Sequence, residues 1–92
     1  MTKRERNAFY ADRWVRVANR NYKRDIKLWG ADETEMVNLV KNDLRDHLAC
    51  ASLMRRGKVK EAADRACDFD TSSRDAIPAS VWDYILSTGY YN

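Results

Sequence analysis

Residues 3–29 read KRERNAFYADRWVRVANRNYKRDIKLW, and this stretch decides the fold. Thr2 and Glu5 fit a capping box at its start and Gly30 is a natural helix end, so we predict one helix over residues 3–29. At about 100° per residue, one side of this helix collects small, aromatic and aliphatic side chains that we expect to be buried. They are Ala8, Ala11, Trp14, Val15, Ala18, Tyr22, Ile26 and Trp29.

The opposite side of the same helix is strongly basic. Residues 3–29 contain nine Lys or Arg and three acids, a net charge of +6, whereas the rest of the chain carries −3 and the whole chain +3. The basic residues within an arc of roughly 100°, together with the aromatic Phe9 on the same arc, form what we call the cationic face. It comprises Arg6, Phe9, Arg13, Arg16, Arg20, Lys23, Arg24 and Lys27. Such a face attracts phosphate groups or an acidic partner.

The remaining apolar residues recur at helical spacing in three further segments. We therefore predict helices over residues 33–56, 58–67 and 78–88. Asp32 and Glu35 resemble a second capping box, Gly57 and Gly89 are natural helix ends, and Pro78 suits a first helical turn. No alternating strand pattern competes. The expected fold is all-α, a compact bundle of about four helices in a single domain, residues 1–92, with a long basic amphipathic helix at its N-terminus.

Two connecting segments are polar or aromatic. The run Asp70, Thr71, Ser72 and Ser73 predicts a turn with a helix cap. The aromatic tail, residues 90–92, is expected to pack back partly on the domain, because two adjacent exposed tyrosines would leave idle apolar surface.

Composition limits the classes of protein that the chain can belong to. Ninety-two residues, 45% of them hydrophobic, predict a folded globule and not a disordered basic tail. No run of about 18 apolar residues occurs and no apolar segment follows the charged start, so we expect neither a membrane span nor a secretory signal. Cys50 and Cys67 lie outside a Cys-x-x-Cys spacing and predict reduced thiols in the cytoplasm.

One helix carries residues with the chemistry of a nucleophilic site. Asp43, His47 and Cys50 lie at i, i+4 and i+7, on the side of their helix that is expected to face the core. A single row on one helix lacks an oxyanion donor, so we interpret it as a partly buried His47 hydrogen-bonded to Asp43 beside an apolar thiol. A zinc site from His47, Cys50 and Cys67 would have three ligands where a structural site takes four. We predict no catalytic residue, no metal and no cofactor.

The chain has a basic opening at residues 2–7, a closing element at residues 68–71 and 74–78, and the adjacent pair Val81 and Trp82. It resembles the short accessory proteins that tailed bacteriophages encode. The resemblance implies a stoichiometric binder of a host enzyme or defence complex, or of nucleic acid, in the host cytoplasm. It assigns a role to no residue.

The favoured expectation is a non-enzymatic regulator or inhibitor that docks the cationic face on an acidic protein surface, in the phage setting that of a host protein or complex. Arginines outnumber lysines there by five to two, which suits bidentate contacts. The alternative is a DNA- or RNA-binding protein that uses the same face on the phosphate backbone. The face could also be solvated and partly neutralised by acids on other helices. A helix of roughly 40 Å leaves room for a homodimer through Tyr10, Val17 and Leu28.

Overall fold

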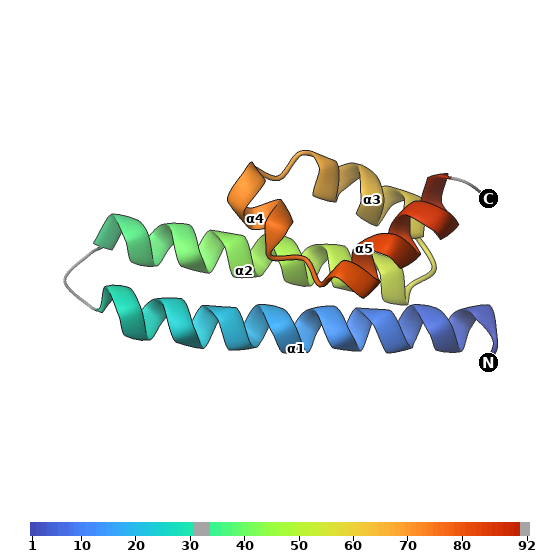
Figure 1. Ribbon diagram of the computed structural model, residues 1–92, viewed down its shortest axis with the longest axis horizontal. Helices are drawn as coiled ribbons and strands as arrows, with labels where there is room; N and C mark the ends of the chain where they lie inside the picture. The colour runs from blue at the N-terminus through green and yellow to red at the C-terminus, as the bar shows by residue number, and fades with distance from the viewer. Residues whose placement is uncertain (31–33, 91–92) are drawn as a thin grey trace.

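The computed structural model describes residues 1–30 and 34–90, and within these ranges the chain is helical and contains no strand (Figure 1). The expected all-α fold is therefore confirmed. Its elements are α1 (Lys3–Trp29), α2 (Thr34–Arg55), α3 (Val59–Cys67), α4 (Thr71–Asp75) and α5 (Ala79–Ile85), followed by a π-helical turn η1 (Leu86–Tyr90).

The five helices form two layers (Figure 1). The long helices α1 and α2 run antiparallel as a hairpin, and α3, α4 and α5 lie across one side of it. This second layer covers the part of the hairpin near the chain ends and leaves the end that connects α1 to α2 projecting beyond it (Figure 1). The molecule is consequently elongated, 45 Å by 23 Å by 19 Å.

Side-chain and glycine caps set the ends of the long helices. The Thr2 hydroxyl accepts from the Glu5 amide at 3.1 Å, and the Glu5 carboxylate accepts from the Thr2 amide at 3.2 Å, which is the expected capping box. Gly30 ends α1 with φ +67° and Gly57 follows α2 with φ +84°. The second capping box was expected at Asp32, which lies outside the described residues.

The C-terminal part differs from expectation in two places. Residues 71–75, predicted as a turn, form the one-turn helix α4, because the Asp70 carboxylate accepts from the Ser73 amide at 2.9 Å and caps it. The prediction that Gly89 ends the last helix is wrong, since the α-helix ends at Ile85 and Gly89 lies inside the π turn η1 that follows it. The expected packing of the tail concerns side chains outside the described part of the chain.

The core lies where the two layers meet. Trp14, Met54, Val81 and Ile85 are completely buried. Helix α3 contributes small residues, which let it approach α2 closely: Val59, Ala62, Ala63 and Ala66 are all buried. Trp29, expected on the buried side of α1, is 42% exposed, and that expectation is wrong. It lies on the projecting end of the hairpin, which no second layer covers (Figure 1).

Candidate functional site

The eight residues of the cationic face are all exposed along α1. The side of the helix that packs on α2 and α5 lies opposite, where Ala11, Trp14 and Ala18 are buried. Amphipathic periodicity thus forces the basic side chains outward, because the apolar side of the same helix supplies the core.

This face is barely neutralised within the molecule. Among the described residues, its one ion pair joins Arg24 to the adjacent Asp25 on α1, with 3.1 Å between Nε and Oδ1. The other described ion pairs, Arg55 with Asp12 and Arg65 with Asp46, involve no cation of the face. Neutralisation by acids on other helices, the alternative interpretation of this face, is not found in the part of the chain that the structure describes.

Phe9 is the apolar member of the face and is 48% exposed. Its ring meets that of Tyr10 edge-on at 5.1 Å, and Tyr10 stacks on Tyr84 of α5 at 4.3 Å. Tyr10 is therefore engaged inside the domain. The other two residues suggested for a homodimer differ from each other in exposure. Val17 is half-buried, whereas Leu28 is 71% exposed.

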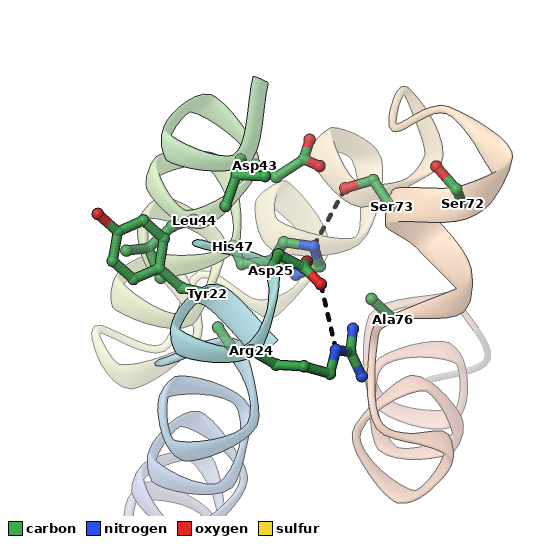
Figure 2. Close-up of a pocket in the computed structure, with 11 residues that line it drawn as sticks. Tyr22, Arg24, Asp25, Asp43, Leu44, His47, Ser72, Ser73 and Ala76 are labelled. Atoms are coloured by element: carbon green, nitrogen blue, oxygen red, sulfur yellow. Dashed lines mark hydrogen bonds and ion pairs between the residues drawn. The ribbon is translucent and has the colours of Figure 1, made fainter. Parts of the chain in front are cut away.

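A second polar centre lies inside the core, between α1, α2 and α4. The indole nitrogen of Trp14 is 2.8 Å from Nδ1 of His47, and Nε2 of His47 is 3.1 Å from Oγ of Ser73. Figure 2 shows His47 and Ser73 beside a small cavity, with Asp43 near the Ser73 hydroxyl. The prediction that His47 bonds to Asp43 is wrong. Its partners come from two other helices, because helix packing and not sequence spacing decides which groups it meets.

The Trp14 contact sets the tautomer of His47. An indole N–H can only donate, so Nδ1 of His47 accepts and the neutral ring carries its proton on Nε2, facing Ser73. In this state the imidazole donates to the Ser73 hydroxyl and cannot take its proton. The pKa of His47 is lowered, because the effect of burial is larger than the opposite effects of the Asp46 charge and of a hydrogen bond to the Ser73 backbone. His47 and Ser73 are thus arranged as structural partners and not as a base with its nucleophile.

The two cysteines lie in different environments. Cys50 is fully buried beside His47 on α2, and burial raises the pKa of its thiol to about 12, so it stays protonated. Cys67 is exposed at the end of α3. In the described ranges, no three His, Cys, Asp or Glu residues are grouped to hold a metal ion, so His47, Cys50 and Cys67 are not brought together as ligands.

Asp43 is exposed at the edge of the same centre. Partial desolvation and the charges of Asp70, Asp46 and Asp25 raise the pKa of its carboxyl, and a hydrogen bond from Ser73 works in the opposite direction. This cluster is acidic, whereas the cationic face on α1 is basic. Asp43, Asp46 and Asp70 of this cluster lie outside α1, whereas Asp25 lies on α1 beside Arg24 of the cationic face.

Two buried polar residues escaped the sequence analysis. Ser73 on α4 is hydrogen-bonded to Nε2 of His47, and Asn7 on α1 accepts a hydrogen bond from the Tyr84 hydroxyl. The helical angle of Asn7 falls between those of Trp14 and Ala18, so periodicity could have placed it on the buried side. Ser73 gave no such signal, because its partner is 26 residues away in the chain.

No described helix combines the length and the apolar character needed to cross a bilayer. Comparison with protein-family models, curated proteins and solved structures finds no match to the chain.

Proposed function

We propose that the protein is a non-catalytic binding protein that docks its cationic face on an acidic surface of another protein and so regulates or inhibits it. The observation that carries the proposal is the surplus of exposed cations without internal partners. Seven Lys or Arg residues lie on one face of α1, and only Arg24 has an ion-pair partner among the described residues. Charge concentrated in this way is costly for the isolated domain and favourable against an acidic partner.

The composition of the face favours recognition over loose attraction. Most of its cations are arginines, whose planar guanidinium groups bind carboxylates through two parallel hydrogen bonds. Phe9 adds an exposed aromatic side chain among these arginines, and its ring packs edge-on against that of Tyr10. Aromatic residues and arginines are the residue types that dominate binding energy in protein interfaces. If the likeness to phage accessory proteins holds, the target belongs to the host.

A DNA- or RNA-binding function is the second candidate, and one observation favours it. Phe9 is exposed between cations, an arrangement that can stack on an unpaired base. The net charge of +3 and the acidic cluster around Asp43, Asp46 and Asp70 weigh against it, because binders of the phosphate backbone usually carry a larger basic excess.

The first experiment measures fluorescence anisotropy of labelled duplex DNA, single-stranded DNA and RNA with the purified protein over a salt series. Binding at micromolar or lower concentration that weakens steeply with salt would replace the protein-partner proposal with the nucleic-acid one. Absence of binding even at low salt supports a protein target, which is then sought by affinity capture from bacterial lysate and identified by mass spectrometry.

A matched pair of variants tests whether the face carries the binding. The change Arg16→Glu with Arg20→Glu reverses two charges four residues apart on the face. Lys41→Glu with Arg45→Glu makes the same change at the same spacing on exposed residues of α2. We expect the first variant to lose the captured partner while remaining folded by circular dichroism, and the second to retain it. Equal retention by both folded variants would contradict the proposal.

A further inference from the structure

A groove runs along one edge of the cationic face, between α1 and the segment that connects α4 to α5. On the α1 side it is lined by Arg13, Arg20 and Arg24, with Val17 between them. On the other side it is lined by residues 75–80, which include the buried Ile77 and the half-buried Pro78. The groove thus has one basic wall and one uncharged stretch, residues 76–80, which Asp75 and Ser72 flank.

Spacing along α1 decides which cations reach this groove. Arg13, Arg20 and Arg24 follow each other at intervals of seven and four residues, so they form a row with separations of about 10 Å and about 6 Å along the helix axis. Arg16 and Lys23 repeat the seven-residue interval but lie about 60° further around the helix, and neither lines the groove. The cationic face therefore has a groove row and an outer row.

Arg24 shows how a member of the groove row is oriented. Its guanidinium lies between Asp25 and Ala76, directed from α1 toward the opposite wall (Figure 2). The Asp25 carboxylate contacts Nε, which leaves the terminal nitrogens of Arg24 without a described partner. Arg13 and Arg20 have no described ion-pair partner at all. The basic wall thus offers donors that are positioned but unused.

The opposite wall discriminates between anionic ligands. It carries no basic side chain, it exposes the Asp75 carboxylate, and its centre is Ala76, Ile77 and Pro78. A phosphate backbone would place charge against an apolar surface and against Asp75, which is unfavourable. A peptide with carboxylates on one side and aliphatic side chains on the other would complement both walls.

We infer that this groove binds an acidic amphipathic helical segment of the partner protein. Its carboxylates, spaced at seven and four residues, pair with Arg13, Arg20 and Arg24, and its aliphatic side chains pack on the half-buried Val17 and Pro78. The inference rests on the proposed function and narrows it, because it places the contact on the groove row and names the chemistry of the bound segment.

The test uses the whole protein and an array of fluorescein-labelled acidic amphipathic peptides, with their Lys-for-Glu counterparts as controls. Arg13→Glu with Arg20→Glu reverses the groove row, and Arg16→Glu with Lys23→Glu makes the equivalent change, at the same spacing, in the outer row. At about 0.15 M salt, where distant charges are screened, we expect the groove variant to weaken peptide binding by about tenfold or more and the outer variant by less than about threefold.

A bulky, uncharged substitution tests the same site without changing its charge. Ala79→Trp places a bulky side chain at an exposed position of the groove wall without changing charge, and Ser52→Trp does the same on exposed α2. We expect only the Ala79 variant to reduce peptide affinity. Circular dichroism and urea unfolding confirm in each case that the variant is folded.

Three outcomes would overturn the inference. Equal loss from the two charge-reversal variants would place the partner on the open face, which leaves the proposed function intact and removes the groove. Failure of every acidic peptide to bind the wild-type protein would remove the acidic-helix ligand, while the captured partner and its loss in the Arg16→Glu, Arg20→Glu variant still test the wider proposal. Displacement of a bound peptide by poly-dT at lower concentration than by unlabelled peptide would assign the groove to nucleic acid.

Discussion

The indole Nε1–H of Trp14 donates a hydrogen bond to Nδ1 of His47 over 2.8 Å and so ties α1 to α2 inside the core. The same imidazole reaches Ser73 on α4 through its other nitrogen. Three helices from distant parts of the chain therefore meet at one ring. The Trp14 contact requires an unprotonated Nδ1, whereas Nε2 can donate to Ser73 in either state of the ring, so protonation of His47 breaks the Trp14 contact and opposes the fold.

Stability should consequently fall as the pH drops below about 6.5. The pKa of His47 is lowered in the folded state, mainly by burial. The unfolded chain therefore binds the proton more readily, and the contribution of the neutral ring is complete above the unfolded pKa and declines toward the folded pKa. Urea unfolding at a series of pH values measures this. His47 is the single histidine, so its NMR titration can be followed without ambiguity.

The variant His47→Gln supplies the control, because it removes the titration and should flatten the pH dependence between about pH 5 and pH 7. The pKa of Asp70 is lowered by hydrogen bonds from Ser73 and Ser72, so its protonation also reduces stability as the pH falls, but in more acidic solution than that of His47. The pKa of Asp43 is raised, mainly by burial, so the effect of Asp43 on stability is opposite: it lowers stability as the pH rises. An unchanged slope in His47→Gln would show that carboxylates, and not His47, control stability in this range.

Trp14→Phe should destabilise the protein through the lost hydrogen bond as well as through lost volume. The ring is completely buried, and without the indole N–H the Nδ1 atom of His47 remains buried without a donor. Such an unsatisfied group costs about 1–3 kcal/mol, and the smaller side chain adds a cavity. Chemical denaturation measures the loss in the free energy of unfolding. The pKa of His47 should also rise, because Nδ1 becomes able to hold a proton.

Trp82→Phe is the matched change. Trp82 lies half-buried on α5, and no hydrogen bond of its indole is found among the described residues. We expect a smaller loss of stability and no change in the titration of His47. If both variants shifted the titration equally, the effect would come from a general loosening of the core and not from the Trp14 contact.

Local patterns in the sequence accounted for α1 and its two sides. Its capping box, its terminal glycine and the 3.6-residue period all depend on residues close together in the chain, and Ala11, Trp14 and Ala18 are buried as expected. Exposure of the cationic face followed from the same period. These features were predictable because no distant residue is needed to specify them.

Features that depend on packing were not predictable in the same way. The partners of His47 come from α1 and α4, so the spacing to Asp43 on its own helix was a misleading guide. Trp29 fits the apolar stripe of α1, yet the second layer ends before reaching it. The groove combines α1 with the segment that contains Ile77, and their proximity arises only when the chain folds.

The two thiols should differ widely in reactivity toward a disulfide reagent such as DTNB. Cys50 is completely buried and its pKa is raised to about 12, whereas Cys67 is exposed. Cys50 can react only through opening of the structure, so we expect one rapid phase and a second that is slower by more than about a hundredfold. Denaturant should merge the two phases. Cys67→Ser should remove the rapid phase, and its persistence in that variant would contradict the assignment of Cys50 as buried.

The two glycines that end the long helices should respond differently to asparagine. Gly57 has φ +84° and belongs to a Schellman motif, in which its amide donates to the Met54 carbonyl at 3.0 Å and that of Lys58 to the Leu53 carbonyl at 2.8 Å. Gly30 combines φ +67° with ψ −174°, a region that only glycine adopts readily. A Cβ at either position would have no atom within 4 Å, so the cost of substitution is conformational.

Alanine at either glycine should therefore lower the free energy of unfolding by about 1–2 kcal/mol. Asparagine tolerates the left-handed region, so Gly57→Asn should recover part of the loss seen in Gly57→Ala, whereas Gly30→Asn should recover none. Thermal and urea unfolding of the four variants measure these differences. Equal recovery at both positions would mean that Gly30 relaxes into the left-handed helical region when substituted. Absence of recovery at Gly57 would mean that the Schellman hydrogen bonds do not hold its backbone in that region in solution.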